Sequence, residues 1–140
     1  MLKKIPGVIS PDLIQTMMRM GHGDELVLAD CDFPAETFSK RIIRADGVMI
    51  ADLLKAILPF YPLDPFVEKP VAIMAPVGDA KEPEVWQEFR KIILRHEKRF
   101  TDFEYAERFV FYQRAKESFA VVITGEPDGN LILQKGVVVV

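Results

Sequence analysis

The stretch Glu25-Leu-Val-Leu-Ala-Asp30 decides the fold class of this chain. Four apolar residues stand between two acidic ones, which predicts a buried strand that ends in an acid. Val71-Ala-Ile-Met-Ala75 and Ala120-Val-Val-Ile-Thr124 have the same character and predict two more buried strands. Shorter strands are expected at Arg41–Arg44 and Leu131–Leu133.

Helical segments alternate with these strands. Ser10 is placed to cap a first helix, Pro11 fits its first position, and Gly21 is placed to end it. The other helices are expected at Val48–Leu58 with Asp46 as cap, after Glu82-Pro83, and at Arg108–Ser118. This alternation predicts a three-layer α/β/α fold with a mainly parallel sheet.

The connection from Thr124 to Leu131 is short and rich in turn residues. A link of that length suits a hairpin, so we expect the sheet to be mixed. No repeat or Gly/Ser linker divides the chain, and 140 residues are the length of one domain. We therefore expect a single domain over residues 1–140.

Composition excludes several classes of function. The formal net charge is −3, which argues against a nucleic-acid partner. No apolar run approaches the roughly 20 residues of a membrane span, and no signal-peptide core follows the N-terminus. Cys31 is the only cysteine, so no internal disulfide is available and a reducing cytoplasm is the expected location.

The common cofactor and metal motifs are absent from the sequence. The glycines form neither a dinucleotide-binding loop nor a phosphate-binding loop. One cysteine and two histidines cannot complete a structural zinc site, and no Gly-x-Ser-x-Gly elbow is present. We therefore expect neither a cofactor nor a metal.

His22 is the first candidate for acid–base chemistry. It stands in Gly21-His-Gly-Asp24, between the end of a helix and the start of a strand. The flanking glycines leave the imidazole accessible, and a histidine near its ordinary pKa exchanges protons at neutral pH. The alternative is a helix-terminus histidine that only satisfies main-chain carbonyls. His96 lies on an apolar helix face and is interpreted as structural or half-exposed.

The remaining candidates are polar residues that suit hydroxyl recognition. Asp30 follows a buried strand, where ligands of α/β sheets gather, although it would also cap the next turn. Asp64 has the same two interpretations. Arg108 and Tyr112 are one helical turn apart and can face one cleft. Cys31 has no histidine near it in the sequence and is interpreted as structural.

A series of motifs then gives the chain a family resemblance. They are Met20-Gly-His-Gly-Asp-Glu25, Leu28-Ala-Asp30, Phe33-Pro-Ala35, Ile43-Arg-Ala-Asp-Gly47, Asp52-Leu-Leu54, Arg108-Phe-Val-Phe-Tyr112, Arg114-Ala115, Phe119-Ala-Val-Val-Ile-Thr-Gly-Glu126 and Gly129-Asn130. In this order, from Ile5 to Gly136, the chain resembles the fucose mutarotase and ribose pyranase family. The Gly-His-Gly-Asp and Arg-x-x-x-Tyr forms are closer to the fucose mutarotase branch.

The resemblance implies a small cytoplasmic α/β protein that works without a cofactor and assembles into rings, commonly decamers. Such proteins interconvert the anomers of a free monosaccharide. The resemblance also implies that His22 is the proton donor, while Asp30, Arg108 and Tyr112 contact the sugar. Asp64 matches a sugar-contacting acid in part of the family.

One departure from the family bears on the identity of the sugar. The family has Tyr-Gly-Asn against the sugar, and here Gly129 and Asn130 match while Asp128 replaces the tyrosine. The loop before this position also looks shorter. An aromatic face has been exchanged for a carboxylate, so the natural sugar is left open.

Three functions follow in order of preference: an L-fucose mutarotase, a pyranase for ribose or another aldose, and a non-catalytic sugar-binding subunit linked to transport. Mutarotation moves a proton from the anomeric hydroxyl and another to the ring oxygen; either Asp30 or an ordered water is the candidate acceptor of the first. His22 precedes a six-residue strand and Asp30 ends it, so they lie roughly 17–20 Å apart. One sugar cannot span that distance unless the loop around His22 folds back or a neighbouring subunit completes the site, and four exposed valines at the C-terminus favour the second. We therefore expect a homo-oligomer, with the Val137–Val140 tail and Gly129-Asn130 near the contact.

Overall fold

The computed structural model describes residues 1–140 as one α/β domain around a six-stranded sheet. Its strand order is β2-β5-β1-β6-β3-β4. The strands are β1 (Glu25–Ala29), β2 (Ile42–Ala45), β3 (Val71–Met74), β4 (Glu104–Ala106), β5 (Ala120–Thr124) and β6 (Leu131–Gln134). The helices are α1 (Pro11–Arg19), α2 (Ile50–Ile57), α3 (Val85–His96) and α4 (Arg108–Glu117).

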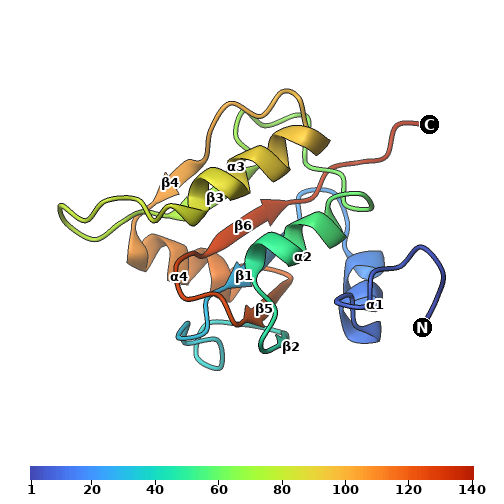
Figure 1. Ribbon diagram of the computed structural model, residues 1–140, viewed down its shortest axis with the longest axis horizontal. Helices are drawn as coiled ribbons and strands as arrows, with labels where there is room; N and C mark the ends of the chain where they lie inside the picture. Colours follow the sequence, from blue (N-terminus) through green and yellow to red (C-terminus); the bar gives the residue numbers. More distant parts are fainter.

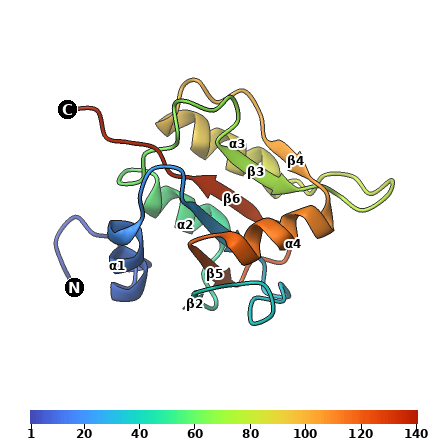
Figure 2. The same cartoon turned by 180° about the vertical axis from the view of Figure 1, so that it is seen from behind.

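Helices cover both faces of the sheet. In Figure 1, α2 and α3 lie in front of the strands, and Figure 2 shows α4 across the opposite face. The period of two in β1 explains the two cores: Leu26 and Leu28 join the larger one under α1, α2 and α3, whereas Val27 and Ala29 join the smaller one under α4. The predicted three-layer α/β/α fold is confirmed.

The prediction of a hairpin between β5 and β6 is wrong, although the sheet is mixed as expected. β5 pairs with β1 in parallel, and the chain then crosses the end of β1 to place β6 on its far side. β6 is antiparallel to both of its neighbours, β1 and β3, while the remaining pairs are parallel. A short link therefore skips one strand instead of closing a hairpin.

Two helix starts show what local signals predicted and what they missed. Ser10 caps α1 as expected, and its hydroxyl accepts from the Leu13 N–H at 3.1 Å. Asp46 does not cap α2, because Gly47 adopts a φ of 81° and Asp46 turns back to pair with Arg44 at 2.7 Å. The edge strand β4 was not predicted from the sequence.

Candidate active site

The ends of β1 and β6 bring Asp30 and Asn130 together at one edge of the sheet. The Asp30 main-chain N–H donates to the Asn130 side-chain oxygen at 2.7 Å, and the Asn130 amide donates to Asp30 Oδ2 at 2.8 Å. Asn130 is buried and Asp30 half-buried. Burial raises the pKa of the Asp30 carboxyl, and the hydrogen bond from Asn130 opposes this only in part.

Arg108 and Tyr112 lie at the same edge, on the first turns of α4. Arg108 Nε donates to the Tyr112 hydroxyl at 2.9 Å. The Tyr112 ring packs edge-on against Phe33, with ring centroids 5.4 Å apart, and Phe33 follows Asp30 by one turn of chain. Arg108 also lines a surface hollow of about 430 Å³ at the end of β3. These side chains supply donors and acceptors suited to sugar hydroxyls.

His22 stands at the other end of β1 and pairs with Asp64. His22 Nε2 is 3.1 Å from Asp64 Oδ2; the imidazole is 45% exposed, whereas the carboxylate is only 3% exposed. The same oxygen accepts from the Gln134 amide at 3.0 Å, and Asp64 Oδ1 accepts from the Phe66 N–H at 3.0 Å.

The environment of Asp64 favours the ionised form of its carboxylate. Burial acts to raise the pKa of the Asp64 carboxyl, but the hydrogen bonds from Phe66, His22 and Gln134 outweigh it and lower the pKa below its ordinary value. An ionised Asp64 accepts a hydrogen bond from His22 Nε2–H, which leaves Nδ1 as the ring nitrogen that can exchange a proton with a ligand. The geometry is that of an oriented acid–base group.

The two groups of side chains do not meet within one chain. β1 has five residues, so its ends are separated by roughly 17 Å, which is more than one monosaccharide spans. The loop around His22 does not fold back over the sheet, because the Gly23 N–H donates to the Lys135 carbonyl beside the end of β6. The chain therefore brings Asp30 to Asn130 and His22 to Asp64, but not His22 to Asp30.

The loop before β6 carries Asp128, the position at which the sequence departs from the resemblance described above. Asp128 is exposed, whereas Gly129 beside it is buried. The Asp128 carbonyl accepts from the Trp86 indole N–H at 2.8 Å, which fixes the main chain of the loop. Sequence reasoning missed Trp86 and Gln134, because an indole on a helix and an amide at a strand end carry no signal of their own.

Two other candidates remain outside both groups. Cys31 is exposed, and desolvation together with the carboxylates of Asp32 and Asp30 raises the pKa of its thiol. A thiol of raised pKa is a poor nucleophile at neutral pH. His96 is exposed at the last turn of α3.

No group of three or more His, Cys, Asp or Glu side chains is arranged to hold a metal ion. No helix is both long and apolar enough to cross a membrane.

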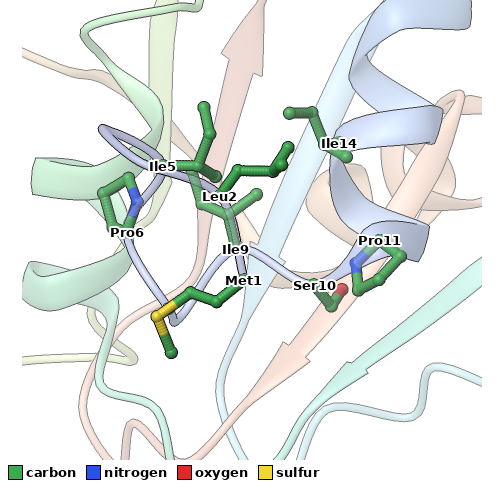
Figure 3. Close-up of a pocket in the computed structure, with 9 residues that line it drawn as sticks. Met1, Leu2, Ile5, Pro6, Ile9, Ser10, Pro11 and Ile14 are labelled. Atoms are coloured by element: carbon green, nitrogen blue, oxygen red, sulfur yellow. The ribbon is translucent and has the colours of Figure 1, made fainter.

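The largest hollow of the molecule lies away from both polar groups. It has a volume of about 500 Å³ and is formed by the N-terminal segment and the start of α1 (Figure 3). Met1, Leu2, Ile5, Ile9 and Ile14 supply most of its lining, and Ser10 is its only hydroxyl side chain. Such a lining offers no group for proton transfer.

Comparisons with known proteins identify the family to which the chain is similar. Residues 3–138 match the sequence pattern of the RbsD / FucU transport protein family. An L-fucose mutarotase from Glaesserella parasuis serovar 5 (strain SH0165) is 46% identical over 140 residues, covering 98% of this chain and 96% of that protein. The family resemblance inferred from the motifs is therefore confirmed.

Two of the matching solved structures contain a bound sugar. The fucose mutarotase from Streptococcus pneumoniae, in complex with L-fucose, is 44% identical with a TM-score of 0.91, and the match covers 99% of this chain and 100% of that one. Bacillus subtilis RbsD complexed with D-ribose is 25% identical with a TM-score of 0.70, again covering 99% and 100% of the two chains. The fold is thus more similar to the fucose-bound relative.

Proposed function

Since the chain belongs to the RbsD / FucU transport protein family, we propose that it is an isomerase, a mutarotase that interconverts the α and β anomers of L-fucose. The observation that carries this assignment is similarity along the whole chain to L-fucose mutarotase, together with a TM-score of 0.91 to a fucose-bound structure against 0.70 to the ribose-bound one. Residues 1–140 form one catalytic domain that works in the cytoplasm.

The chemistry asks for two proton transfers. Ring opening takes the proton from the anomeric hydroxyl and gives one to the ring oxygen; closure on the other face reverses both. His22, oriented by buried Asp64, donates the proton to the ring oxygen. Asp30 accepts the anomeric proton, a role that its raised pKa favours because it makes the carboxylate a stronger base.

The remaining polar groups hold the sugar. Asn130 and Gly129 approach it from the loop before β6, and Arg108 and Tyr112 bind hydroxyls from α4. Asp64 remains a predicted sugar contact. Because its oxygens already accept from His22, Gln134 and Phe66, we propose that it also positions His22.

A complete site requires a second subunit. His22 of one protomer and Asp30 of a neighbour would supply the two proton-transfer groups, because one chain holds them at opposite ends of β1. The exposed tail Val137–Val140 and the exposed Met18, Phe60 and Phe66 offer apolar surface for such contacts. We propose a homo-oligomer, a ring of ten subunits, with each site at a contact.

The second candidate activity is a pyranase for ribose or another aldose. Asp128 favours it, because a carboxylate replaces the aromatic face that L-fucose meets in the related branch. A purely sugar-binding subunit is the third candidate. The His22–Asp64 pair argues against it, because hydroxyl recognition alone needs no oriented acid–base pair.

Exchange NMR with a panel of free sugars tests the proposal. Wild-type protein is expected to speed exchange between the anomers of L-fucose well above the spontaneous rate, and to act less on D-ribose. Faster exchange of D-ribose would move the assignment to the pyranase, whereas binding of sugar without exchange would favour the transport subunit. Light scattering is expected to give a ring; a fully active 15.9 kDa monomer would remove the shared site.

A further inference from the structure

The segment Thr124–Asn130 makes several of the hydrogen bonds that hold the chain around Asp30. The Thr124 hydroxyl donates to the Ala29 carbonyl at 2.7 Å, and Asn130 closes two hydrogen bonds with Asp30. The position of the Asp30 carboxylate therefore depends on how firmly the Thr124–Asn130 segment is itself held.

Trp86 of α3 anchors this segment. Its indole is buried, with 3% exposure, and Nε1 donates to the Asp128 carbonyl at 2.8 Å. Gly129 lies directly against the same helix, because a Cβ there would fall 2.9 Å from the Phe89 ring and 3.4 Å from Trp86 Nε1. Glycine is required by this close approach, which brings the main chain of the loop onto the aromatic side chains of α3.

Glu126 holds the segment from the other side. Its carboxylate is buried and lies 3.4 Å from both the Asp128 N–H and the Ile50 N–H at the start of α2. Its carbonyl accepts from the Cys31 N–H at 2.9 Å, next to Asp30. Both hydrogen bonds of the carboxylate are longer than the indole bond, so Trp86 is the stronger anchor.

We propose that Trp86 is a positioning residue for sugar recognition. Through the Asp128 carbonyl it fixes the Thr124–Asn130 segment, and through that segment the Asp30–Asn130 pair, without touching the sugar itself. The inference rests on the proposed function, which assigns this pair to the sugar. A site that is held rigidly before binding loses less conformational freedom when the ligand arrives, so its anchor contributes to affinity.

Loosening the Asp30–Asn130 pair should change the kinetic constants in a specific way. The pair binds the sugar, and Asp30 also accepts the anomeric proton, so loosening the pair raises KM and lowers kcat as well. A merely structural role would instead lower the amount of active protein, which reduces the apparent kcat at constant KM.

The experiment compares Trp86→Phe with Tyr61→Phe. The first keeps an aromatic ring and removes the N–H donor; the second removes the buried Tyr61 hydroxyl, which donates to the Leu133 carbonyl at the same 2.8 Å. We expect Trp86→Phe to raise KM for L-fucose about three- to tenfold, the effect of one lost hydrogen bond, together with a fall in kcat. Tyr61→Phe should leave KM unchanged at a similar loss of Tm.

Equal KM values for the two variants, or a fall in kcat alone for Trp86→Phe, would overturn the inference. If Trp86→Phe does not fold, Glu126→Gln is measured in its place, since it keeps the size of the side chain and removes one of two acceptors. A raised KM in Glu126→Gln supports positioning by the segment, and an unchanged KM overturns it. If the wild-type protein does not exchange L-fucose, the proposed function itself is refuted. If it does exchange L-fucose and the two variants have equal KM values, only the positioning role of Trp86 is refuted.

Discussion

The aspartates that lie near the two ends of β1, Asp30 and Asp64, have pKa shifts in opposite directions. Asp30 is half-buried with a raised pKa and lies in a network of amide and main-chain groups. Asp64 is almost fully buried, yet its pKa is lowered because three donors converge on it, one of them His22. Depth of burial alone thus does not set the charge preference of a carboxyl group. The neighbouring charges differ: Asp30 faces the carboxylate of Asp32, whereas Asp64 faces His22, which suits one end to accepting a proton and the other to orienting a donor.

The largest effect is expected from His22→Gln. Glutamine can replace the hydrogen bond to Asp64 but cannot transfer a proton at neutral pH, so anomer exchange should fall by about 100-fold or more while sugar binding persists. Exchange NMR and saturation-transfer NMR measure the two quantities on one sample. Wild-type exchange rates in this variant would remove the acid–base role of this end of β1.

Mixing two inactive variants tests whether the two ends serve one site. If His22 and Asp30 meet across subunits, co-refolded His22→Gln and Asp30→Asn chains should recover about a quarter of wild-type exchange, because that share of random contacts combines two intact groups. The separate variants, taken through the same refolding, are the control. An inactive mixture that still forms mixed oligomers would place both groups in one subunit.

The contributions of Asp64 and Asp30 to folding stability should depend on pH in opposite ways. The ionised form of Asp64 is favoured in the folded state, so its contribution is present above the ordinary aspartate pKa and is lost as pH falls through the lowered value. Asp64→Asn should therefore lower Tm at neutral pH by roughly a few degrees, with the gap closing in acid.

Asp30 should behave in the opposite way. Its protonated form is favoured on folding, so its contribution is present at low pH and is lost as pH rises through the raised value. Asp30→Asn should then raise Tm slightly at neutral pH although it abolishes exchange. Parallel melting curves for Asp30→Asn and Asp64→Asn across pH 3–8 check both signs; equal shifts would contradict the comparison.

The smallest effect concerns the choice of sugar. Asp128 is exposed and its main chain is fixed by Trp86, so Asp128→Tyr restores an aromatic face without moving the loop. Activity on L-fucose should rise about threefold, a modest gain typical of one stacking contact. Asp128→Asn is the matched control for loss of charge alone. A fall in L-fucose activity with tyrosine would mean that the carboxylate belongs to a fucose site.

The sequence predicted the layers and most elements because they depend on local periodicity and caps. The strand Ala120–Thr124 and the Ser10 cap were predicted correctly for this reason. The placement of β6 was not, because loop length cannot tell a hairpin from a link that skips a strand. Similarly, the role of Asp64 depends on Gln134, a partner 70 residues away that no local pattern reveals.

β6 fixes the spacing between the two polar groups at the ends of the sheet. Asn130 precedes its first residue and contacts Asp30, while Gln134 is its last residue and contacts Asp64. A slip of one residue would turn every side chain to the opposite face and remove both contacts together. We therefore expect relatives to keep β6 at a fixed length and to vary around it in the Gly125–Gly129 turn and the valine tail.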